Sequence, residues 1–257
     1  MEVSAVSEQA LWEDVAAGLR HAITSGEYGP GDTLPTEYEL SGKYGVSRDT
    51  VRRALGRLTQ EGLLTPGRGR LGRQVRKSKP IVFYAERSES QDREAQRRAA
   101  GVDAWVMDAA DQGRRGGQSI AVSMEEAAAE VASRLDIPEG ELVVVRRRLR
   151  TIDGEPHNLN DTYYPRDLAE GTAIMHPADV TQGVIALMRD KGINQDRYRD
   201  DLETRMPTPD EAERLLIPPG VPVLVQYRTG YAAERAVKVT ITMWPGDRTT
   251  LAYEFPA

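Results

Sequence analysis

The fold is decided by the stretch from residue 35 to residue 64, which reads PTEYELSGKYGVSRDTVRRALGRLTQEGLL. Thr36 can cap a helix, and Glu39, three residues later, completes a capping box. Gly45 makes a tight turn, and Ser47 caps a further helix from about residue 48 to residue 61. The apolar residues that recur at helical spacing in this second helix are Val51, Leu55 and Leu58. The stretch therefore predicts two helices joined by a tight turn.

Two more elements flank this pair of helices. Upstream, apolar residues at helical spacing predict a helix near residues 9–25, which Gly26 ends. Downstream of Gly62, two short strands around a Gly- and Arg-rich tip at residues 66–73 predict a wing. A nucleotide-binding phosphate loop is disfavoured, because the tip lacks the Walker lysine-serine pair and follows a helix.

The helix that begins after Ser47 carries arginines on its remaining surface. The first turns of such a helix reach base edges when it lies in the major groove of DNA. Arginine suits this position because its guanidinium can bond O6 and N7 of guanine together, whereas hydroxyls and helix starts suit phosphates. Glycines and arginines at the wing tip suit a narrow minor groove. The candidate DNA-contacting residues are Thr36, Ser47, Arg48, Thr50, Arg52, Arg53, Gly69, Arg70 and Arg73.

The net charge of −6 is unevenly distributed along the chain. Residues 1–42 carry a net −7, residues 43–77 carry +8, and the remainder carries −7. Such a distribution indicates one cationic face on an acidic protein, as electrostatic docking on DNA requires. The alternative interpretation of the charge alone is a solvated, charged helix.

Residues 9–75 resemble the winged-helix domain of the GntR family of bacterial transcription factors. The matching segments are Leu34-Pro35-Thr36-Glu37, Tyr44-Gly45-Val46-Ser47-Arg48, Thr50-Val51-Arg52-Arg53-Ala54-Leu55 and Glu61-Gly62-Leu63. The family usually has arginine where this chain has Tyr38, so a DNA contact made there in relatives is in doubt. The resemblance implies double-stranded operator DNA as a partner. A closed homodimer presents two recognition helices about a two-fold axis, so we expect an inverted-repeat operator.

The remainder of the chain contains an internal repeat of helix, Pro-Gly turn and strand. The first copy has a helical run from Glu125 to Arg134 and a strand at 142–152. The second copy has a helix from Asp210 to Leu215 and a strand at 222–231. Asp153-Gly154 is a strong hairpin signal between strands 142–152 and 155–163. A second hairpin joins 222–231 to 236–243, and 249–255 supplies another strand. We expect two similar halves in an α+β domain with a mainly antiparallel sheet.

Residues 80–257 resemble the UTRA ligand-sensing domain of HutC-type members of the GntR family. The resemblance rests on Leu135-Asp136-Ile137-Pro138-Glu139-Gly140, Arg148-Leu149-Arg150, Asp153-Gly154-Glu155-Pro156, Tyr163-Tyr164-Pro165, Gly192-Ile193 and Gly246-Asp247-Arg248. It implies a chorismate-lyase-like fold that binds a small, usually anionic effector, such as a phosphorylated or carboxylated metabolite, and does not catalyse. The expected organisation is a winged helix-turn-helix at 1–75, a basic linker at 76–80 and a UTRA-like effector-binding and dimerisation domain at 81–257.

Arg148 and Arg150 face the same side of their strand, so both can converge on one anion. In the family, arginines at these positions contact the effector. Sugar-sensing relatives have glutamates where this chain has Asn160 and Lys238, and this exchange favours a more anionic ligand. Weaker candidates, chosen as hydroxyls near such sites, are Thr181, at the start of a helix at 181–190, and Ser88 and Ser90 in an early polar loop.

Several classes of function are excluded or disfavoured. The chain has no cysteine, so no disulfide framework, thiol nucleophile or Cys-based zinc site can form. Its three histidines, His21, His157 and His176, share no metal spacing and no evident catalytic partner. No signal peptide or membrane-length apolar run is present, so we expect a cytoplasmic protein. From the residue types above we also expect no cofactor and no metal. Two alternatives remain open: a metabolite-independent repressor of plasmid or mobile-element transfer genes, and a chorismate-lyase-like enzyme with a DNA-binding arm.

Overall fold

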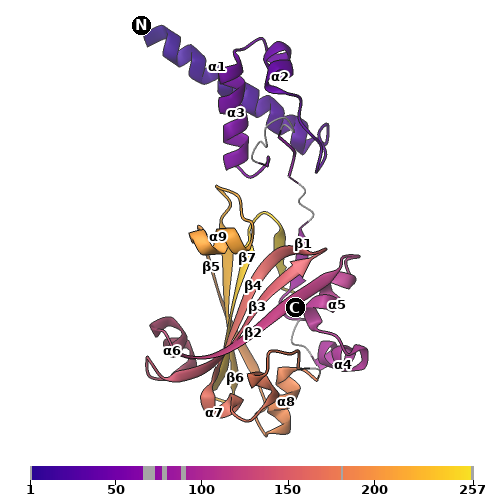
Figure 1. Cartoon of the computed structure of the whole chain (residues 1–257), viewed down its shortest axis with the longest axis vertical. Helices are drawn as coiled ribbons and strands as arrows, with labels where there is room; N and C mark the ends of the chain where they lie inside the picture. Colours follow the sequence, from indigo (N-terminus) through magenta and orange to yellow (C-terminus); the bar gives the residue numbers. More distant parts are fainter. Residues whose placement is uncertain (1, 66–72, 77–79, 88–90, 181, 256–257) are drawn as a thin grey trace. The chain divides into compact units, whose positions relative to one another are not determined.

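The computed structural model describes residues 2–65, 73–76, 80–87, 91–180 and 182–255 (Figure 1). The chain divides into two compact units. The first comprises Met1–Lys79 with Met206–Ala212 and Leu216–Pro222, and the second comprises the rest of the chain from Pro80. Within the described residues, no helix combines the length and the apolar character needed to cross a bilayer.

The N-terminal unit contains three helices, α1 (Glu2–Thr24), α2 (Glu37–Tyr44) and α3 (Arg48–Gln60). The predicted capping box of α2 is present: the Thr36 hydroxyl accepts a hydrogen bond from the Glu39 N–H, and the Glu39 carboxylate accepts one from the Thr36 N–H at 2.8 Å. Gly45 ends α2 at φ 65°, a left-handed conformation that glycine adopts without strain. Ser47 caps α3 by accepting a hydrogen bond from the Thr50 N–H at 3.1 Å.

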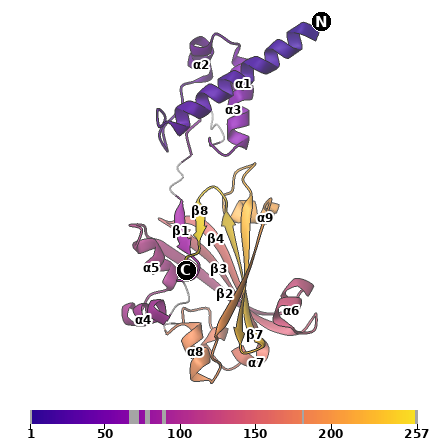
Figure 2. The same cartoon turned by 180° about the vertical axis from the view of Figure 1, so that it is seen from behind.

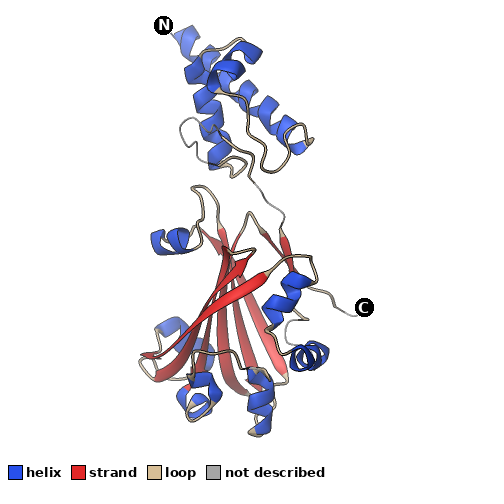
Figure 3. Ribbon diagram, turned by 45° about the vertical axis from the view of Figure 1, so that its right-hand side comes forward, coloured by secondary structure: helices blue, strands red, loops and turns tan. Residues whose placement is uncertain are grey.

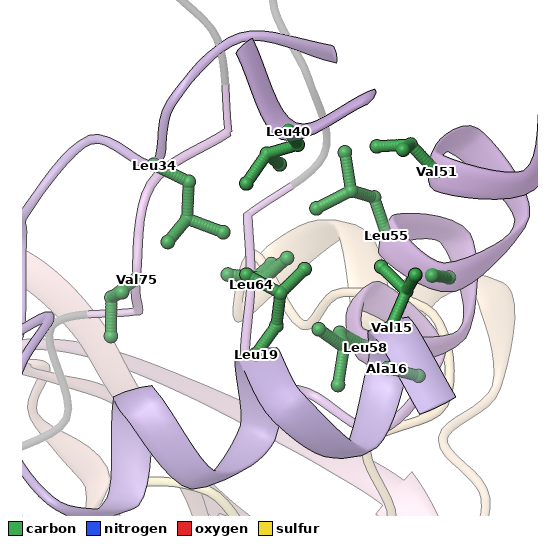
Figure 4. Close-up of a cluster of buried hydrophobic side chains, with 11 residues drawn as sticks. Val15, Ala16, Leu19, Leu34, Leu40, Val51, Leu55, Leu58, Leu64 and Val75 are labelled. Atoms are coloured by element: carbon green, nitrogen blue, oxygen red, sulfur yellow. The ribbon is translucent and has the colours of Figure 1, made fainter. Parts of the chain in front are cut away.

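The three helices share one apolar core, drawn in Figure 4. Val15 and Leu19 of α1 meet Leu40 of α2 and the Val51–Leu58 stripe of α3, and all of these side chains are buried. Leu34, Leu64 and Val75 close the same core from the segments around the helices. The apolar residues that recur at helical spacing in the sequence thus form the core. Their burial fixes the orientation of α3 and leaves its arginines on the surface that faces away from the core.

Short extended segments lie beside these helices, as the predicted wing requires. Thr33 forms a β-bridge with Gln74, and Leu64 forms one with Val75. Backbone hydrogen bonds from the Val75 N–H to the Asp32 carbonyl (2.8 Å) and from the Leu34 N–H to the Arg73 carbonyl (2.9 Å) extend this pairing. Residues 66–72, which include the predicted wing tip, lie outside the described residues.

The C-terminal unit is built on a six-stranded antiparallel sheet with the strand order β2-β3-β4-β7-β6-β5 (Figures 1 and 2). The strands are β2 (Gly116–Glu126), β3 (Leu142–Ile152), β4 (Glu155–Pro165), β5 (Arg197–Arg205), β6 (Val223–Ala232) and β7 (Arg235–Pro245). Two short strands, β1 (Ile81–Tyr84) and β8 (Thr249–Ala252), pair in parallel as a separate sheet. The helices are α4 (Gln91–Ala100), α5 (Ala104–Ala110), α6 (Ala129–Leu135), α7 (Arg166–Ala169), α8 (Val184–Asp190) and α9 (Pro209–Arg214), with a 3₁₀ turn η2 (Ala173–Met175).

This strand order is what two similar halves produce. The series β2, α6, β3, β4 is repeated as β5, α9, β6, β7, and the halves meet where β4 pairs with β7. The hairpin between β3 and β4 turns at Asp153 and Gly154, both at positive φ, as the Asp-Gly signal predicts. The predicted α+β class with a mainly antiparallel sheet is therefore confirmed.

Alternation along β3 separates the two faces of the main sheet. Val143 and Val145 pack against α6, whereas Val144 packs with α7, η2 and α8 on the other face. In Figures 1 and 3, α6 lies on one side of the sheet, and α4, α5 and α8 lie on the other. Gly116 allows α5 to approach closely, because a Cβ there would lie 2.9 Å from the Cα of Val106.

Some predicted boundaries were wrong. The first helix begins at Glu2 instead of near residue 9. The predicted helix from Glu125 is strand up to Glu126, because Glu125 pairs in register with Val143, and α6 starts only at Ala129. The helix predicted to open at Thr181 begins at Val184 with Gly183 as its N-cap.

Candidate DNA-contacting helix and effector pocket

The exposed surface of α3 carries four arginines, Arg48, Arg52, Arg53 and Arg57. Arg52 forms an ion pair with Asp49, and the Arg53 guanidinium lies 5.8 Å from the Trp12 ring centroid. Arg57 bonds Glu61, which also holds Arg20 through two hydrogen bonds of 2.9 Å. Arg48, at the start of α3, makes no ion pair or aromatic contact of this kind among the described residues. These pairs are solvent-exposed and therefore weak, so DNA phosphates or bases can replace them.

Three other predicted DNA contacts are placed differently from expectation. Thr50 is buried, and its hydroxyl shares a 2.8 Å hydrogen bond with Ser47, so it supports the N-terminus of α3 instead of facing a phosphate. The exposed Thr36 is already engaged in the capping box with Glu39. Arg73 is half-buried, and its Nη1 donates to the Leu55 carbonyl (3.1 Å) and to the Thr59 hydroxyl (2.6 Å). This geometry anchors the wing segment to α3 and does not extend Arg73 toward a minor groove.

The two wing-tip residues predicted to approach DNA, Gly69 and Arg70, lie outside the described residues, as do Ser88, Ser90 and Thr181 among the predicted effector contacts.

The C-terminal unit contains a cavity of about 140 Å³ on the face of the sheet that α4, α5 and α8 cover. A cavity of about 150 Å³ can hold a molecule the size of benzene. Four predicted effector residues line this cavity together: Arg148, Arg150, Asn160 and Lys238. The other charged residues of its lining are Arg93, Arg97, Asp103, Asp108, Arg146, Asp179 and Arg228. The cavity is therefore lined by more basic than acidic side chains.

Two of these arginines are committed to the fold. Arg146 is fully buried and donates to the carbonyls of Ile174, His176 and Ala178, each at 2.7 Å. Arg228 bonds both carboxylate oxygens of Asp200, at 2.7 and 2.6 Å, and the Ala85 carbonyl at 2.7 Å. Removing either would leave several buried acceptors unpaired, so both support the walls of the cavity.

Arg93 and Arg97 are also paired. Arg93 forms ion pairs with Asp108 and Asp111, and Arg97 bonds Asp179 (2.7 Å) and lies 3.4 Å from Asp103. These pairs tie α4 to α5 and to the 179–180 segment.

Arg148 and Arg150 are the cavity arginines with the fewest anionic contacts. Arg148 is buried, and its hydrogen-bond partners among the described residues are the neutral Asn160 Oδ1 (3.3 Å) and Thr162 hydroxyl (3.2 Å). Arg150 lies 5.5 Å from the Trp105 ring centroid and, among the described residues, makes no hydrogen bond. Burial lowers the pKa of Arg150 to about 10, and Asp103 opposes this shift, so the guanidinium stays charged at neutral pH. Both side chains are therefore suited to receive an anion.

Asp103 is a buried carboxylate whose negative charge interacts with both of these arginines. It caps α5 by accepting a 2.8 Å hydrogen bond from the Trp105 N–H. Burial opposes its ionisation, but the charges of Arg150 and Arg97 outweigh that effect and lower the pKa of Asp103. An anion bound to Arg150 would therefore compete with Asp103.

Sequence reasoning missed several residues of this site. Asp103 and Trp105 belong to the 80–120 segment, whose resemblance to any family was loose. The role of Arg146 depends on carbonyls about thirty residues away, which no local pattern indicates. Only its place in the Arg146–Arg150 alternation could have marked it as facing the same cavity as Arg148.

Comparison with known families agrees with this architecture. Residues 111–250 match the UTRA domain family, which is more than half of the chain. Residues 11–70 match the family described as bacterial regulatory proteins, gntR family.

Curated relatives align over almost the whole chain. An uncharacterized HTH-type transcriptional regulator of Streptomyces coelicolor is 30% identical over 95% of this chain and 92% of its own. The HTH-type transcriptional repressor NagR of Bacillus subtilis is 28% identical over 98% of both chains.

Solved structures show the same arrangement of elements. A GntR-family transcriptional regulator matches with a TM-score of 0.66 and 27% identity over 96% of this chain and 98% of its own. PhnF from Mycobacterium smegmatis matches with a TM-score of 0.55 and 27% identity over 95% and 99%.

Proposed function

The chain belongs to the GntR family of bacterial regulatory proteins and carries a UTRA domain, and from this premise we propose that it is a repressor released from its operator by a small anionic effector. It is a DNA-binding transcription regulator and not an enzyme, as its relatives are. The names of NagR and PhnF, both HTH-type transcriptional repressors, support repression as its mode of action. Such a regulator works in the cytoplasm, where the bacterial chromosome lies.

The exposed start of α3 supports base readout in the major groove. Arg48 and Arg52 lie one helical turn apart and are exposed, so each can address a neighbouring base step. The buried stripe of α3 and the Ser47 cap hold the helix in one orientation. In a homodimer the two copies of α3 would bind the halves of an inverted repeat.

The observation that carries the effector proposal is the pair Arg148 and Arg150 in one cavity, with only neutral hydrogen-bond partners on Arg148 and none on Arg150 among the described residues. A buried positive charge without an anionic partner is costly, and an anionic ligand offsets that cost. Asn160 and Lys238 complete the polar lining. This favours a sensor that binds a metabolite over one that has lost its ligand.

Release from DNA follows from linkage between the two binding equilibria. The effector lowers operator affinity only by its differential affinity for the two arrangements of the dimer. Because the coupling is reciprocal, operator DNA weakens effector binding by the same factor, typically 5- to 150-fold.

The experiment measures operator binding by the full-length protein while sugar phosphates and carboxylates are titrated at constant ionic strength. We expect one of these anions to release the DNA, and Arg148→Ala to abolish release while operator affinity without effector stays near wild type. Arg166→Ala, on the exposed Arg166–Glu170 pair of α7, is the matched control and should respond like wild type.

Two results would contradict the proposal. If an inducer binds the Arg148→Ala, Arg150→Ala double variant as tightly as wild type, the effector site lies elsewhere. If no anion releases the DNA, the protein is a metabolite-independent regulator, of the kind that could control transfer genes of a mobile element.

A further inference from the structure

One register row of the sheet crosses the cavity from the anion site to strand β6. Arg148 on β3 pairs with Asn160 on β4. Asn160 pairs with Thr242 on β7, which in turn pairs with Gln226 on β6. All four side chains line the cavity, and all are buried. We call these four residues the hydrogen-bond row, because each hydrogen bond within it decides which atoms of the next side chain remain for a ligand.

The orientation of the Asn160 amide is fixed by Arg148. A guanidinium only donates, so the atom that accepts from Arg148 Nη1 at 3.3 Å is the Asn160 oxygen. Asn160 Nδ2 then faces Thr242 and donates to its hydroxyl oxygen at 2.7 Å. The Thr242 hydroxyl therefore accepts from Asn160, and its own proton has no acceptor among the described residues. That proton is left for a ligand in the cavity.

The orientation of the Gln226 amide is fixed by Asp200 and Tyr253. The Tyr253 hydroxyl donates to Asp200 Oδ2 at 2.9 Å, so its oxygen accepts from Gln226 Nε2 at 3.2 Å. Nε2 also donates to Asp200 Oδ2 at 3.1 Å, so both of its protons are used. The amide cannot turn over, because its oxygen would then face the carboxylate. Gln226 Oε1 is therefore held on the side away from Asp200.

Gln226 Oε1 is an accessible acceptor without a partner. Among the described residues no hydrogen bond to this oxygen is formed, and it is not one of the fully buried polar atoms that lack a partner, so it retains accessible surface. Gln226 as a whole is only 3% exposed and lines the cavity, so this surface faces the cavity. The cavity thus contains a fixed, neutral acceptor at the end of the row remote from Arg148.

Thr242 and Gln226 together specify the group that complements them. They are opposed across β7 and β6, where Cβ atoms lie about 4.5–5.5 Å apart, so one atom can reach both. That atom must accept from the Thr242 hydroxyl and donate to Gln226 Oε1. A hydroxyl does both, whereas an ether oxygen only accepts and an ammonium group only donates. The positive charges of Arg228 and Lys238 in the lining also disfavour an ammonium.

The same row sets the distance between this position and the anion site. Arg148 reaches over β4, where its Nη1 bonds Asn160, and Thr242 and Gln226 lie on the next two strands. Neighbouring strands are about 4.8 Å apart, so the two groups of a ligand are separated by about 5–10 Å. A chain of about two to four carbon atoms covers this range. A cavity of about 140 Å³ has room for a molecule of that size.

We propose that Gln226 is a specificity-determining residue of the effector cavity, and that the effector is a short-chain anion with a hydroxyl group at the end remote from its anionic group. The hydroxyl accepts from Thr242 and donates to Gln226 Oε1. Asp200 is the positioning residue that holds the Gln226 amide. This inference rests on the proposed anion site at Arg148 and Arg150.

The test compares alkylphosphonates that differ in a terminal hydroxyl. 2-Hydroxyethyl-, 3-hydroxypropyl- and 4-hydroxybutylphosphonate are each paired with the n-alkylphosphonate in which a methyl group replaces the hydroxyl, so size and charge are matched within a pair. Binding to the full-length protein is measured by calorimetry at constant pH and ionic strength, with inorganic phosphate as the reference anion. We expect one hydroxyl compound to bind at least about tenfold tighter than its methyl counterpart, because two hydrogen bonds form and each contributes a few-fold.

Gln226→Met should reduce this hydroxyl preference to less than about twofold, because methionine has nearly the length of glutamine but no comparable acceptor. Affinity for the methyl counterpart should stay within about twofold of wild type, which shows that the anion site is intact. Thr242→Val, which keeps the shape of threonine, is a second variant and should reduce the same preference at least about threefold. Gln118→Met, on the edge strand β2 and outside the cavity lining, is the matched control and should retain it.

The outcomes separate the two proposals. Phosphonates that bind without a hydroxyl preference at any chain length, or a preference that survives in Gln226→Met, overturn the role of Gln226 and leave the anion site in place. If Gln226→Met binds no phosphonate at all, an undiminished hydroxyl preference in Thr242→Val overturns the hydroxyl position. If none of the phosphonates and no inorganic phosphate binds the wild type, the anion site itself fails, and the role of Gln226 fails with it.

Discussion

Arg73→Ala separates two roles for this arginine, anchoring the wing segment and contacting DNA. Arg73 donates to the Leu55 carbonyl at 3.1 Å and to the Thr59 hydroxyl at 2.6 Å. Hydrogen bonds from charged groups contribute about 1.5–3 kcal/mol each when well buried. Because Arg73 is half-buried and solvent screens its charge, we expect the two bonds together to contribute about 1–2 kcal/mol.

This loss should appear in local opening of the wing segment. A change of 1–2 kcal/mol corresponds to a factor of about 5–30 in the opening equilibrium, so hydrogen exchange of the Val75 and Leu34 amides should accelerate by that factor. Both amides belong to the backbone pairing around Arg73. Arg48→Ala, at the first residue of α3 and distant along the helix from Thr59, should leave these exchange rates unchanged.

The salt dependence of DNA binding provides the second readout. A side chain that neutralises a phosphate contributes about 0.9 to the slope of log K against log salt concentration. For Arg73→Ala we expect weaker binding with an unchanged slope. Unchanged exchange rates together with a slope reduced by about 0.9 would refute the anchoring role.

Three further predictions concern individual side-chain contacts of the protein. Asp103→Asn should tighten binding of inorganic phosphate about tenfold in calorimetry, since it removes a charge that competes for Arg150; equal or weaker binding would refute the competition. The pKa of Glu125 is lowered to about 2 by hydrogen bonds from Arg147 and Ser123, so its contribution to stability is complete above about pH 4.5 and is lost as the pH falls toward 2. Glu125→Gln should therefore cost up to about 1 kcal/mol at pH 7 in urea denaturation, since the pair is partly exposed, and the difference from wild type should vanish near pH 2; a difference independent of pH would contradict this assignment. Thr36→Ala should destabilise α2 by about 1 kcal/mol through loss of the capping box, seen as faster exchange of α2 amides, and unchanged exchange would show that the cap contributes nothing.

The parts of the fold that the sequence predicts are those with local causes. The caps at Thr36 and Ser47, the α3 stripe and the Asp153-Gly154 turn each act within a few residues, and all are present in the structure. The internal repeat predicts two similar halves, because a repeated order of helices and strands implies a repeated pairing of the strands. The sequence predicts no helices or strands in segment 80–120, because α4 is strongly polar and the edge strand β2 has no regular alternation in its burial.

The candidate site divides in the same way. Alternation along β3 is enough to place Arg148 and Arg150 on one face. The direction of a long side chain, however, depends on partners distant in sequence. Arg73 donates to a carbonyl and a hydroxyl of α3, and Arg146 donates to three carbonyls of the 174–178 segment. Residue type and spacing therefore indicated Arg148 and Arg150, but not the paired arginines that share the cavity with them.

The central claim, that α3 reads an operator as part of a symmetric dimer, is tested most directly by selecting bound sequences from random DNA with the wild-type protein and with Arg48→Ala. We expect the wild type to enrich an inverted repeat. Arg48→Ala should lose base preference at one symmetric pair of positions and about 1–3 kcal/mol of binding free energy per half-site, while Arg166→Ala should select the wild-type motif. A single isolated half-site, or an Arg48→Ala protein that selects the same motif with wild-type affinity, would contradict the account.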